Sequence, residues 1–535
     1  MKVLDYDATE QRHLGRTIAR QAAENGDCTF IMFGDTRYTF AETNAKVNQL
    51  AAGLAESGLS AGDRIAFFMS SSPEVIFLVL AANKLGAIWV PVNTDYKGAW
   101  LEDTINRSRP TLVFTDASHA DRLAAVQTEL AGLPIVVLGD PGPLQGSRSF
   151  DSFYVADAAE PDMSAFSYSD TCAVLWTSGT TGRSKGVMQS HNVWFNACLS
   201  ATAQYKTQAD DVIFCVLPMY NSAAWVTSIF RALLAGVPLA IDQSFSVSNF
   251  WERVSYYGAT QIFTLGAMHM FLWNSPETPH DADNSLRKIQ AVPMPHDIIE
   301  PFAKRFGVEV LGQGMSQSEA MMIVNQYAGG RTSWPPGSCG GPTHLVDIKL
   351  TDDDGNEVGI GEHGECWIKP KQDYAIFNGY FDDPEATANA YEGEWYKTGD
   401  LLKRDADDVF YFVDRKKDAV RFKGRNISTF EVEMVARKHP AVLDCAAFGI
   451  ASEHLESENE IKLDIILREG HTPEPEDIAR FINENAPYFF VPRYIEFVSE
   501  LPYTPTNKIQ KYKLRDKGLT PATWDANQAG FKAAR

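Results

Sequence analysis

In the first part of the chain, apolar residues with helical spacing alternate with short continuous apolar runs. Apolar residues from 47 to 54 have helical spacing, and a short apolar run follows at 64–69. The same order returns before a second apolar run at 87–92. Helices that alternate with buried strands predict an α/β fold with largely parallel sheets. Further segments of these kinds are the strand candidates Ile213–Leu217, Gln261–Leu265 and Val308–Leu311 and the helix candidate Ser246–Tyr257.

The pattern changes near residue 346. From there to residue 370 polar and apolar residues alternate, and the turn sequences DDDGN and GIGEHG interrupt them. This arrangement is typical of antiparallel hairpins and predicts a barrel-like subdomain. Near the end of the chain, Ile478, Phe481 and Ile482 have helical spacing, and residues 494–498 read as a strand. We therefore expect a separate small α+β unit there.

Composition and charge narrow the function classes. The 535 residues suggest two or more domains, at roughly 100–200 residues per domain. A net charge of -21 argues against binding to nucleic acid or anionic membranes, which needs basic patches. No run of about 18 apolar residues and no apolar core of a signal peptide is found, so we expect no membrane span and no secretion signal. Seven scattered cysteines without a CxxC pair indicate a reducing compartment, and we expect the cytoplasm.

The most informative segment is LWTSGTTGRSKGV at residues 175–187. A short apolar run leads into a loop of glycine, serine and threonine that ends in a lysine. Glycines let backbone N–H groups approach an anion, hydroxyls add donors, and the lysine adds a positive charge. The segment therefore predicts a polyphosphate site, although it does not satisfy the P-loop pattern GxxxxGK[ST]. A Ser/Thr-rich surface loop is the alternative, and the strand candidates on either side favour the phosphate site. The candidate phosphate-binding residues are Thr177, Ser178, Gly179, Thr180, Thr181, Gly182 and Lys185.

The segment TSGTTGRSKG resembles the phosphate loop of the adenylate-forming superfamily, which includes acyl-CoA synthetases, firefly-type luciferases and peptide-synthetase adenylation domains. Further signatures follow in the same order along the chain. As a whole, the chain resembles the acyl-CoA synthetase branch and its carnitine- and crotonobetaine-type CoA ligases. The resemblance implies an α/β fold in two domains. Residues 1–416 would form a large N-terminal domain with α/β subdomains and a β-barrel-like subdomain, and residues 417–535 a small mobile α+β domain with the catalytic lysine.

The segment GQGMSQSEA resembles the second signature of the superfamily. Ser318 and Glu319 align with its final pair, in which the hydroxyl residue meets phosphate and the glutamate holds Mg²⁺. A carboxylate is a suitable ligand for this ion. Met315 stands where the family has an aromatic residue against adenine, and an alternative register places Gln317 at the glutamate position.

Three signatures of the last third of the chain complete the resemblance. Asp400 in YKTGDL resembles the carboxylate that accepts the ribose hydroxyls of ATP, and an ionised carboxylate suits a diol because it only accepts hydrogen bonds. Arg415 resembles an arginine that contacts ribose or phosphate, and Lys417 occupies the hinge position between two active poses. Lys423 and Gly424 resemble the CoA-binding segment. Lys508 in LPYTPTNKIQ resembles the catalytic lysine, which also contacts the nucleotide.

The resemblance implies a two-step reaction with ATP, Mg²⁺ and CoA. A small-molecule carboxylic acid would attack the α-phosphate and form an acyl-AMP, and the thiol of CoA would then take the acyl group. The identity of the acid stays open, because Tyr220 and Asn221 replace the usual aromatic–histidine pair. The candidates for the acyl pocket are Asn221, Trp225 and Met268, although Met268 also reads as a core residue.

Two other functions fit the same residues. An acyl-AMP ligase that loads a carrier protein would share the small domain and the catalytic lysine, and consumption of free CoA discriminates it. A non-catalytic nucleotide-binding relative is the third reading. The departures at Met315 and Asn507 support it, and the retained Lys185 and Lys508 argue against it. A homodimer is compatible with either ligase.

Overall fold

The computed structural model describes residues 2–533 except 131, 178–183, 328–330, 332, 417, 419, 423–424, 452–458 and 504–508. The chain divides into two compact units. The first unit comprises Met1–Thr177, Ser184–Asp347 and Pro370–Asn389, and the second comprises Ile348–Lys369 and Ala390–Arg535. Residues on both sides of position 416 belong to the second unit, so the domain boundary expected there stays a prediction.

The first unit contains a seven-stranded sheet with the order β14-β13-β12-β10-β11-β1-β2. Its strands are parallel except at the edge, where β2 runs antiparallel to β1. The predicted strand at 261–265 coincides with β12, whereas the candidate at 213–217 ends at residue 215. The strands are β1 (Thr29–Phe33), β2 (Thr36–Thr39), β10 (Ile213–Cys215), β11 (Leu239–Ile241), β12 (Gln261–Leu265), β13 (Lys288–Val292) and β14 (Glu309–Val310).

A second seven-stranded sheet of this unit has the order β7-β6-β5-β3-β4-β8-β9. It is also parallel except for β9, which pairs antiparallel with β8. This antiparallel hairpin carries the predicted phosphate loop between its strands. The strands are β3 (Arg64–Phe68), β4 (Ile88–Pro91), β5 (Leu112–Asp116), β6 (Ile135–Leu138), β7 (Arg148–Ser149), β8 (Thr171–Trp176) and β9 (Gly186–Ser190).

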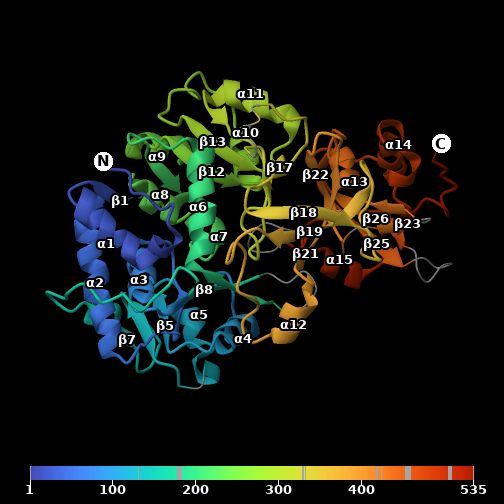
Figure 1. Cartoon of the computed structure of the whole chain (residues 1–535). Helices are drawn as coiled ribbons and strands as arrows, with labels where there is room; N and C mark the ends of the chain where they lie inside the picture. The colour runs from blue at the N-terminus through green and yellow to red at the C-terminus, as the bar shows by residue number, and fades with distance from the viewer. Residues whose placement is uncertain are drawn as a thin grey trace. The chain divides into compact units, whose positions relative to one another are not determined.

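Helices separate and cover these sheets. Figure 1 shows α1, α2 and α3 side by side, and α3 is buried at nearly every position because it packs inside the unit. The helix expected at 246–257 begins at residue 250, because residues 247–249 form a turn. The helices are α1 (Leu14–Asn25), α2 (Phe40–Glu56), α3 (Pro73–Lys84), α4 (Ala99–Ser108), α5 (Ala120–Ala124), α6 (His191–Tyr205), α7 (Ser222–Ala224), α8 (Phe230–Ala235), α9 (Phe250–Tyr257), α10 (Ala267–Trp273), α11 (His296–Phe306) and α12 (Pro384–Asn389).

An aromatic cluster lies where β4, α6 and α8 meet. The indole of Trp89 lies 5.4 Å from that of Trp194 and 4.9 Å from that of Trp225, measured between ring centroids. Phe230 closes the cluster, and all four side chains are fully buried. Large buried aromatic side chains of this kind dominate core energetics. A small sheet of β15 (Gly314–Met315), β16 (Val324–Asn325) and β17 (Gly341–Pro342) completes the unit.

The second unit is built from antiparallel hairpins and a small α+β layer. Its five-stranded sheet has the order β18-β19-β21-β20, with β22 on β21, and its four-stranded sheet has the order β25-β26-β27-β28. The strands are β18 (Val346–Thr351), β19 (His363–Pro370), β20 (Tyr391–Glu392), β21 (Trp395–Arg404), β22 (Phe410–Arg415), β23 (Val420–Phe422), β24 (Arg425–Ile427), β25 (Val442–Ala451), β26 (Asn459–Leu467), β27 (Tyr494–Phe497) and β28 (Trp524–Asp525). The helices are α13 (Thr429–Ala436), α14 (Pro475–Asn485) and α15 (Lys511–Lys517).

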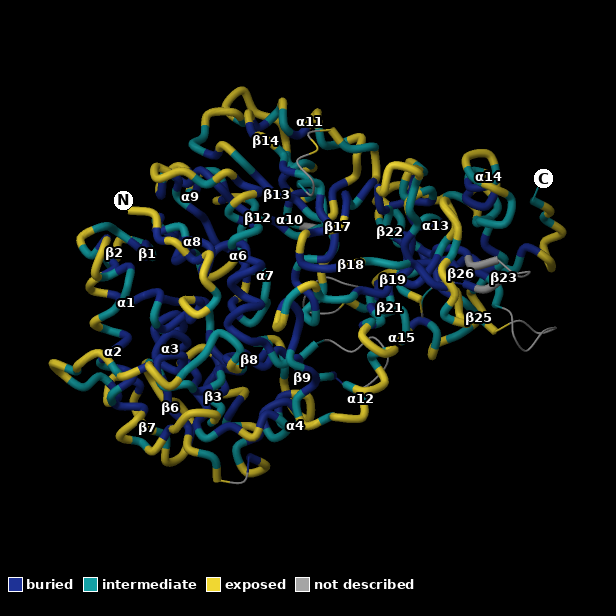
Figure 2. Tube along the Cα trace, viewed as in Figure 1, coloured by how far each residue is buried: buried dark blue, intermediate teal, exposed yellow. Residues whose placement is uncertain are grey.

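The core of the second unit lies between α13, α14 and the sheet of β25 and β26. The apolar side chains of Ile478 and Ile482, predicted from helical spacing, are fully buried in it. In Figure 2 these strands are dark blue, whereas exposed yellow segments follow the loops. Together with the parallel sheets of the first unit, this arrangement confirms the predicted α/β class with a barrel-like part and a small α+β part. Within the described ranges, no helix has the length and apolar character that a membrane crossing needs.

Candidate active site

Strands β8 and β9 form the stem of the predicted phosphate loop. Trp176 pairs with Gly186 at the end of the hairpin. Beyond this pair the backbone N–H of Thr177 donates to the carbonyl of Lys185 at 3.0 Å, and the hydroxyl of Ser184 donates to the carbonyl of Thr177. Both ends of the loop are therefore held on one rigid hairpin. The residues between them, Ser178, Gly179, Thr180, Thr181 and Gly182, lie outside the described residues.

A segment at 378–381 extends the sheet beyond β9. Backbone N–H groups donate from Met188 to Gly379 and from Phe381 to Gly186, at 3.0 and 2.7 Å. Gly186 allows this approach, because a Cβ atom there would lie 3.2 Å from the Cβ atom of Phe381. The pairing brings Tyr380 of this segment against the stem of the loop.

Tyr380 connects the lysine of the loop with the predicted metal-binding glutamate. The ammonium nitrogen of Lys185 lies 4.5 Å from the centroid of the Tyr380 ring. The hydroxyl of the same tyrosine donates to the Oε1 atom of Glu319 at 2.9 Å. Because the ring is buried, it fixes a cation over its face and a carboxylate at its hydroxyl. The structure thus brings together two groups that the sequence placed more than a hundred residues apart.

The backbone around Glu319 is fixed to the same layer. The N–H of Phe377 donates to the carbonyl of Glu319 at 2.8 Å, and the side-chain amide of Gln189 donates to the carbonyl of Ser318. Ser318 therefore lies beside β9, close in sequence to the carboxylate. Met315 pairs with Val324 in the small sheet and is partly exposed.

In the second unit, Asp400 and Arg415 form a close ion pair. They stand directly opposite each other on β21 and β22. The guanidinium Nε of Arg415 lies 2.7 Å from the Oδ1 atom of Asp400. The carboxylate is 2% exposed, and the arginine side chain is 40% exposed. The outer half of the pair therefore faces water, where a polar ligand could reach it.

The three acyl-pocket candidates have different surroundings. The side-chain oxygen of Asn221 accepts a hydrogen bond from the N–H of Ala223 at 3.0 Å and so caps α7. Trp225 is part of the buried aromatic cluster, and its indole N–H donates to the carbonyl of Met219 at 2.7 Å. Met268 is partly buried against the core cluster around α9 and α11. Asn221 and Met268 are thus the two candidates with exposed surface.

Four further candidates, Lys417, Lys423, Gly424 and Lys508, lie outside the described residues. Beside the predicted hinge, Arg515 donates to the carboxylate of Asp418 at 3.0 Å. Tyr380 is the functional residue that sequence reasoning missed. It follows an Asn-Gly dipeptide that reads as an ordinary turn, so no local signal identifies it.

Comparison with known proteins extends over most of the chain. The profile of a family described as AMP-binding enzyme matches residues 18–381, and that of the AMP-binding enzyme C-terminal domain matches residues 431–508. The crotonobetaine/carnitine–CoA ligase of Escherichia coli (strain K12 / DH10B) is 31% identical over 491 residues, which cover 90% of this chain and 93% of that protein. The enzyme of the same description from Salmonella arizonae is 30% identical over 490 residues, with 89% and 93% covered.

Solved structures share the fold. ATP-bound MatB from Rhodopseudomonas palustris is 26% identical and has a TM-score of 0.81, with 94% of this chain and 98% of that chain covered. The anthranilate CoA ligase AuaEII in complex with anthranoyl-AMP has a TM-score of 0.82 at 24% identity, with 94% and 97% covered. At this level of identity the second likeness concerns the fold alone.

Proposed function

The chain belongs to the AMP-binding enzyme family and is an acid–thiol ligase, and from this premise we propose that it joins a small carboxylic acid to CoA through an acyl-AMP. The family assignment confirms the resemblance seen in the sequence. The overall reaction consumes ATP and releases AMP and pyrophosphate. Seven free cysteines fit a reducing compartment, and we extend the proposal to the cytoplasm.

The contact of Lys185 and Glu319 with one tyrosine is the observation that carries the proposal. Transfer of an adenylyl group brings a carboxylate against a polyphosphate, so catalysis depends on positioning and on neutralising negative charge. A lysine supplies positive charge to phosphate oxygens, and a glutamate binds a divalent cation. Tyr380 holds both at fixed positions beside the stem of the phosphate loop.

In the first half-reaction a carboxylate oxygen of the acid attacks the α-phosphorus of ATP. The bond between the α-phosphorus and the bridging oxygen breaks, and pyrophosphate leaves. We assign the β- and γ-phosphates to the loop at 177–185 and the ribose diol to Asp400 with Arg415. We propose that the ammonium group of Lys508 neutralises the negative charge that builds between the carboxylate and the α-phosphate.

The residues present fit Mg²⁺. The described candidates are the carboxylate of Glu319 and the hydroxyl of Ser318, both hard oxygen donors, and Mg²⁺ in nucleotide sites uses one or two carboxylates with phosphate oxygens and water. The hydroxyl of Tyr380 orients the carboxylate through Oε1. When bound, the ion neutralises phosphate charge.

In the second half-reaction the sulfur of CoA attacks the acyl carbon of the acyl-AMP. The thiol gives its proton to water, the bond between the acyl carbon and the phosphate oxygen breaks, and AMP leaves. We propose that a backbone rotation at Lys417 withdraws Lys508 before this step. Lys423 and Gly424 would then line the path of the pantetheine arm, where a glycine allows close approach.

For the acid we propose a betaine-type compound with a quaternary ammonium group. Two curated relatives are named for crotonobetaine and carnitine. The residue before Asn221 supports this class. The hydroxyl of Tyr220 lies 3.4 Å from Oδ2 of the Asp95 carboxylate. Burial raises the pKa of the Tyr220 hydroxyl, and the charges of Asp95 and of the neighbouring Tyr96 raise it further. A carboxylate with aromatic rings around it is a favourable environment for a cation.

The reaction class is tested by pyrophosphate and AMP release across a panel of carboxylic acids, with and without CoA. AMP formation that needs both one acid and CoA supports the proposal. Pyrophosphate release that CoA does not change would instead indicate a carrier protein as the acceptor. Silence across short, branched, aromatic and betaine acids would favour the non-catalytic reading.

The acid class is tested with a pair that differs in charge alone. γ-Butyrobetaine and 5,5-dimethylhexanoic acid have the same shape, because a quaternary carbon replaces the quaternary nitrogen. We expect kcat/KM for the cationic acid to be at least about tenfold higher. Equal values would overturn the betaine assignment and leave the ligase assignment intact.

A further inference from the structure

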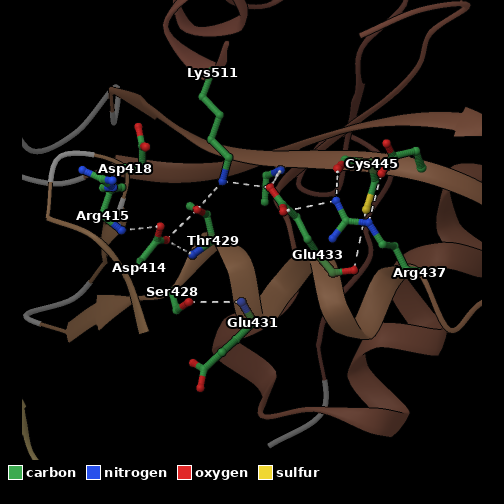
Figure 3. Close-up of polar contacts among 12 residues, drawn as sticks. Asp414, Arg415, Asp418, Ser428, Thr429, Glu431, Glu433, Arg437, Cys445 and Lys511 are labelled. Carbon is green, nitrogen blue, oxygen red and sulfur yellow. Dashed lines mark hydrogen bonds and ion pairs between the residues drawn. The ribbon is translucent and has the colours of Figure 1, made fainter. Parts of the chain in front are cut away.

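A buried carboxylate in the second unit is connected to both flanks of the segment that carries Lys508, directly on one side and through two further side chains on the other. Figure 3 shows it at the centre of a polar cluster: Glu433 on α13 lies between Lys511 on one side and Arg437 on the other. The residue is 4% exposed. A buried carboxylate without partners would be strongly unfavourable, so these contacts determine its position.

The flank after the segment is held by Lys511, three residues beyond Lys508. Its ammonium nitrogen lies 2.8 Å from Oε1 of Glu433, and the N–H of Ala447 donates to the same oxygen at 2.9 Å. Lys511 also donates to the hydroxyl of Thr429 at 2.6 Å. The first residue of α15 is therefore fixed to α13 and β25.

The flank before the segment is connected to the other carboxylate oxygen indirectly, through Arg437 and Asp444. Arg437 places one guanidinium nitrogen 3.4 Å from Oε2 of Glu433 and another 3.0 Å from Asp444. The hydroxyl of Tyr503 donates to Asp444 at 2.5 Å. One carboxylate is thus connected to the residues on both sides of segment 504–508.

The backbone closes the same loop at its base. Tyr503 and Ile509 form an antiparallel bridge, and the N–H of Gln510 donates to the carbonyl of Pro502 at 2.7 Å. These bonds set the separation of the two stems. Packing of Leu501, Ile509 and Leu514 against β25 also holds the stems. Lys511 and Tyr503 add the polar contacts to α13 and β25.

We propose that Glu433 is a positioning residue for Lys508, which rests on the proposed function in that Lys508 is the adenylating lysine. The carboxylate contacts no substrate in this role and acts through Lys511 and Arg437. All these contacts lie after residue 417 in the chain, so they would travel with Lys508 through a rotation there. By contrast, Asp414 precedes residue 417, and its hydrogen bonds to Thr429, both 2.6 Å, would have to break.

The test separates the two half-reactions. Glu433→Gln removes the charge that both flanks share and keeps the shape. We expect the kcat of acid-dependent ATP–pyrophosphate exchange to fall about 10–100-fold, as for loss of one well-positioned group, with little change in KM for ATP. Conversion of supplied acyl-AMP and CoA to the thioester should stay within about threefold, because that step does not need Lys508.

A matched control is Glu496→Gln in the same unit. Glu496 is also buried and accepts hydrogen bonds from Lys462, Lys517 and Thr523. These donors are distinct from Lys511 and Tyr503, which connect Glu433 to the two flanks. It should lower the melting temperature without the selective loss of exchange. Because Glu433→Gln could fail to fold, Tyr503→Phe at the exposed end of the network provides a second test, with an expected loss of about 3–10-fold in exchange.

Hydrogen exchange gives a readout that needs no activity. In Glu433→Gln the amide of Gln510 should exchange at least about tenfold faster than in Glu496→Gln. Equal exchange rates, or an equal fall in both half-reactions, would overturn the positioning role. If the unchanged chain supports no acid-dependent exchange, the proposed function fails, and the amide measurement still decides whether Glu433 anchors the segment.

Discussion

Replacing Tyr380 with phenylalanine separates the hydroxyl, which orients Glu319, from the ring, which faces Lys185. The lost hydrogen bond joins a 6% exposed tyrosine to a partly exposed carboxylate at 2.9 Å. A hydrogen bond to a charged group contributes about 1.5–3 kcal/mol. Water can replace part of it at a half-buried carboxylate, so we expect about 1–2 kcal/mol, which corresponds to about 5–30-fold.

The effect should appear in the binding of magnesium–ATP and in the adenylation step. The assay is the initial rate of pyrophosphate release at varied magnesium–ATP with a fixed acid. We expect kcat/KM for magnesium–ATP to fall about 5–30-fold. The melting temperature should change little, because the ring keeps its packing. Tyr380→Leu should reduce kcat/KM further, since it also removes the ring that faces Lys185.

Tyr411→Phe is the matched control. Its hydroxyl donates to the carboxylate of Asp405 at 3.0 Å, so the chemistry of the lost bond is the same. The bond joins the start of β22 to the turn that precedes it, whereas the predicted site residue Arg415 is at the other end of β22. If Tyr380→Phe changes kcat/KM no more than this control does, the role assigned to the tyrosine is wrong.

Three other predictions follow from single side chains. Asp400→Asn should raise KM for ATP about 10–100-fold in a steady-state assay, because it removes the charged acceptor that Arg415 orients. Burial raises the pKa of Glu496, but hydrogen bonds, chiefly from Lys462, lower it to about 2. This carboxyl therefore stabilises the fold above its unfolded value of 4.5 and loses that contribution as pH falls toward 2, so melting temperatures of Glu496→Gln and the unchanged chain should converge at low pH. Asn221→Ala should lower the stability by about 1 kcal/mol, and Asn221→Ser should restore it; a KM for the acid that stays raised in the serine variant would show that the amide binds substrate.

Local sequence patterns predicted the positions of strands and helices better than they predicted which strands pair. The apolar run that became β12 was located at both ends, because a buried strand between turn residues has a clear signal. The pairing of β1 with β11, by contrast, joins residues such as Ile31 and Leu239. Hydrophobic periodicity is local and does not encode which distant strands become neighbours.

The same difference separates the site residues that were predicted from those that were not. Lys185 and Glu319 lie in segments whose residue types already indicate phosphate and metal chemistry. Tyr380 and Glu433, by contrast, belong to no sequence motif that indicates such chemistry. Their roles come from contacts made by strand pairing at β9 and by the position of α13, and such contacts exist only in the folded chain.

The pair Asp400–Arg415 depends on geometry for a further reason. The first matched family profile ends at residue 381 and the second begins at residue 431, so Asp400 and Arg415 lie between the two matches. Their assignment rests on the resemblance of the sequence around them, and the register of β21 and β22 places the two residues opposite each other. A shift of one residue would move either side chain to the other face of the sheet. The short distance between the guanidinium and the carboxylate shows that the two predicted residues lie together, and their contacts with the nucleotide stay a prediction.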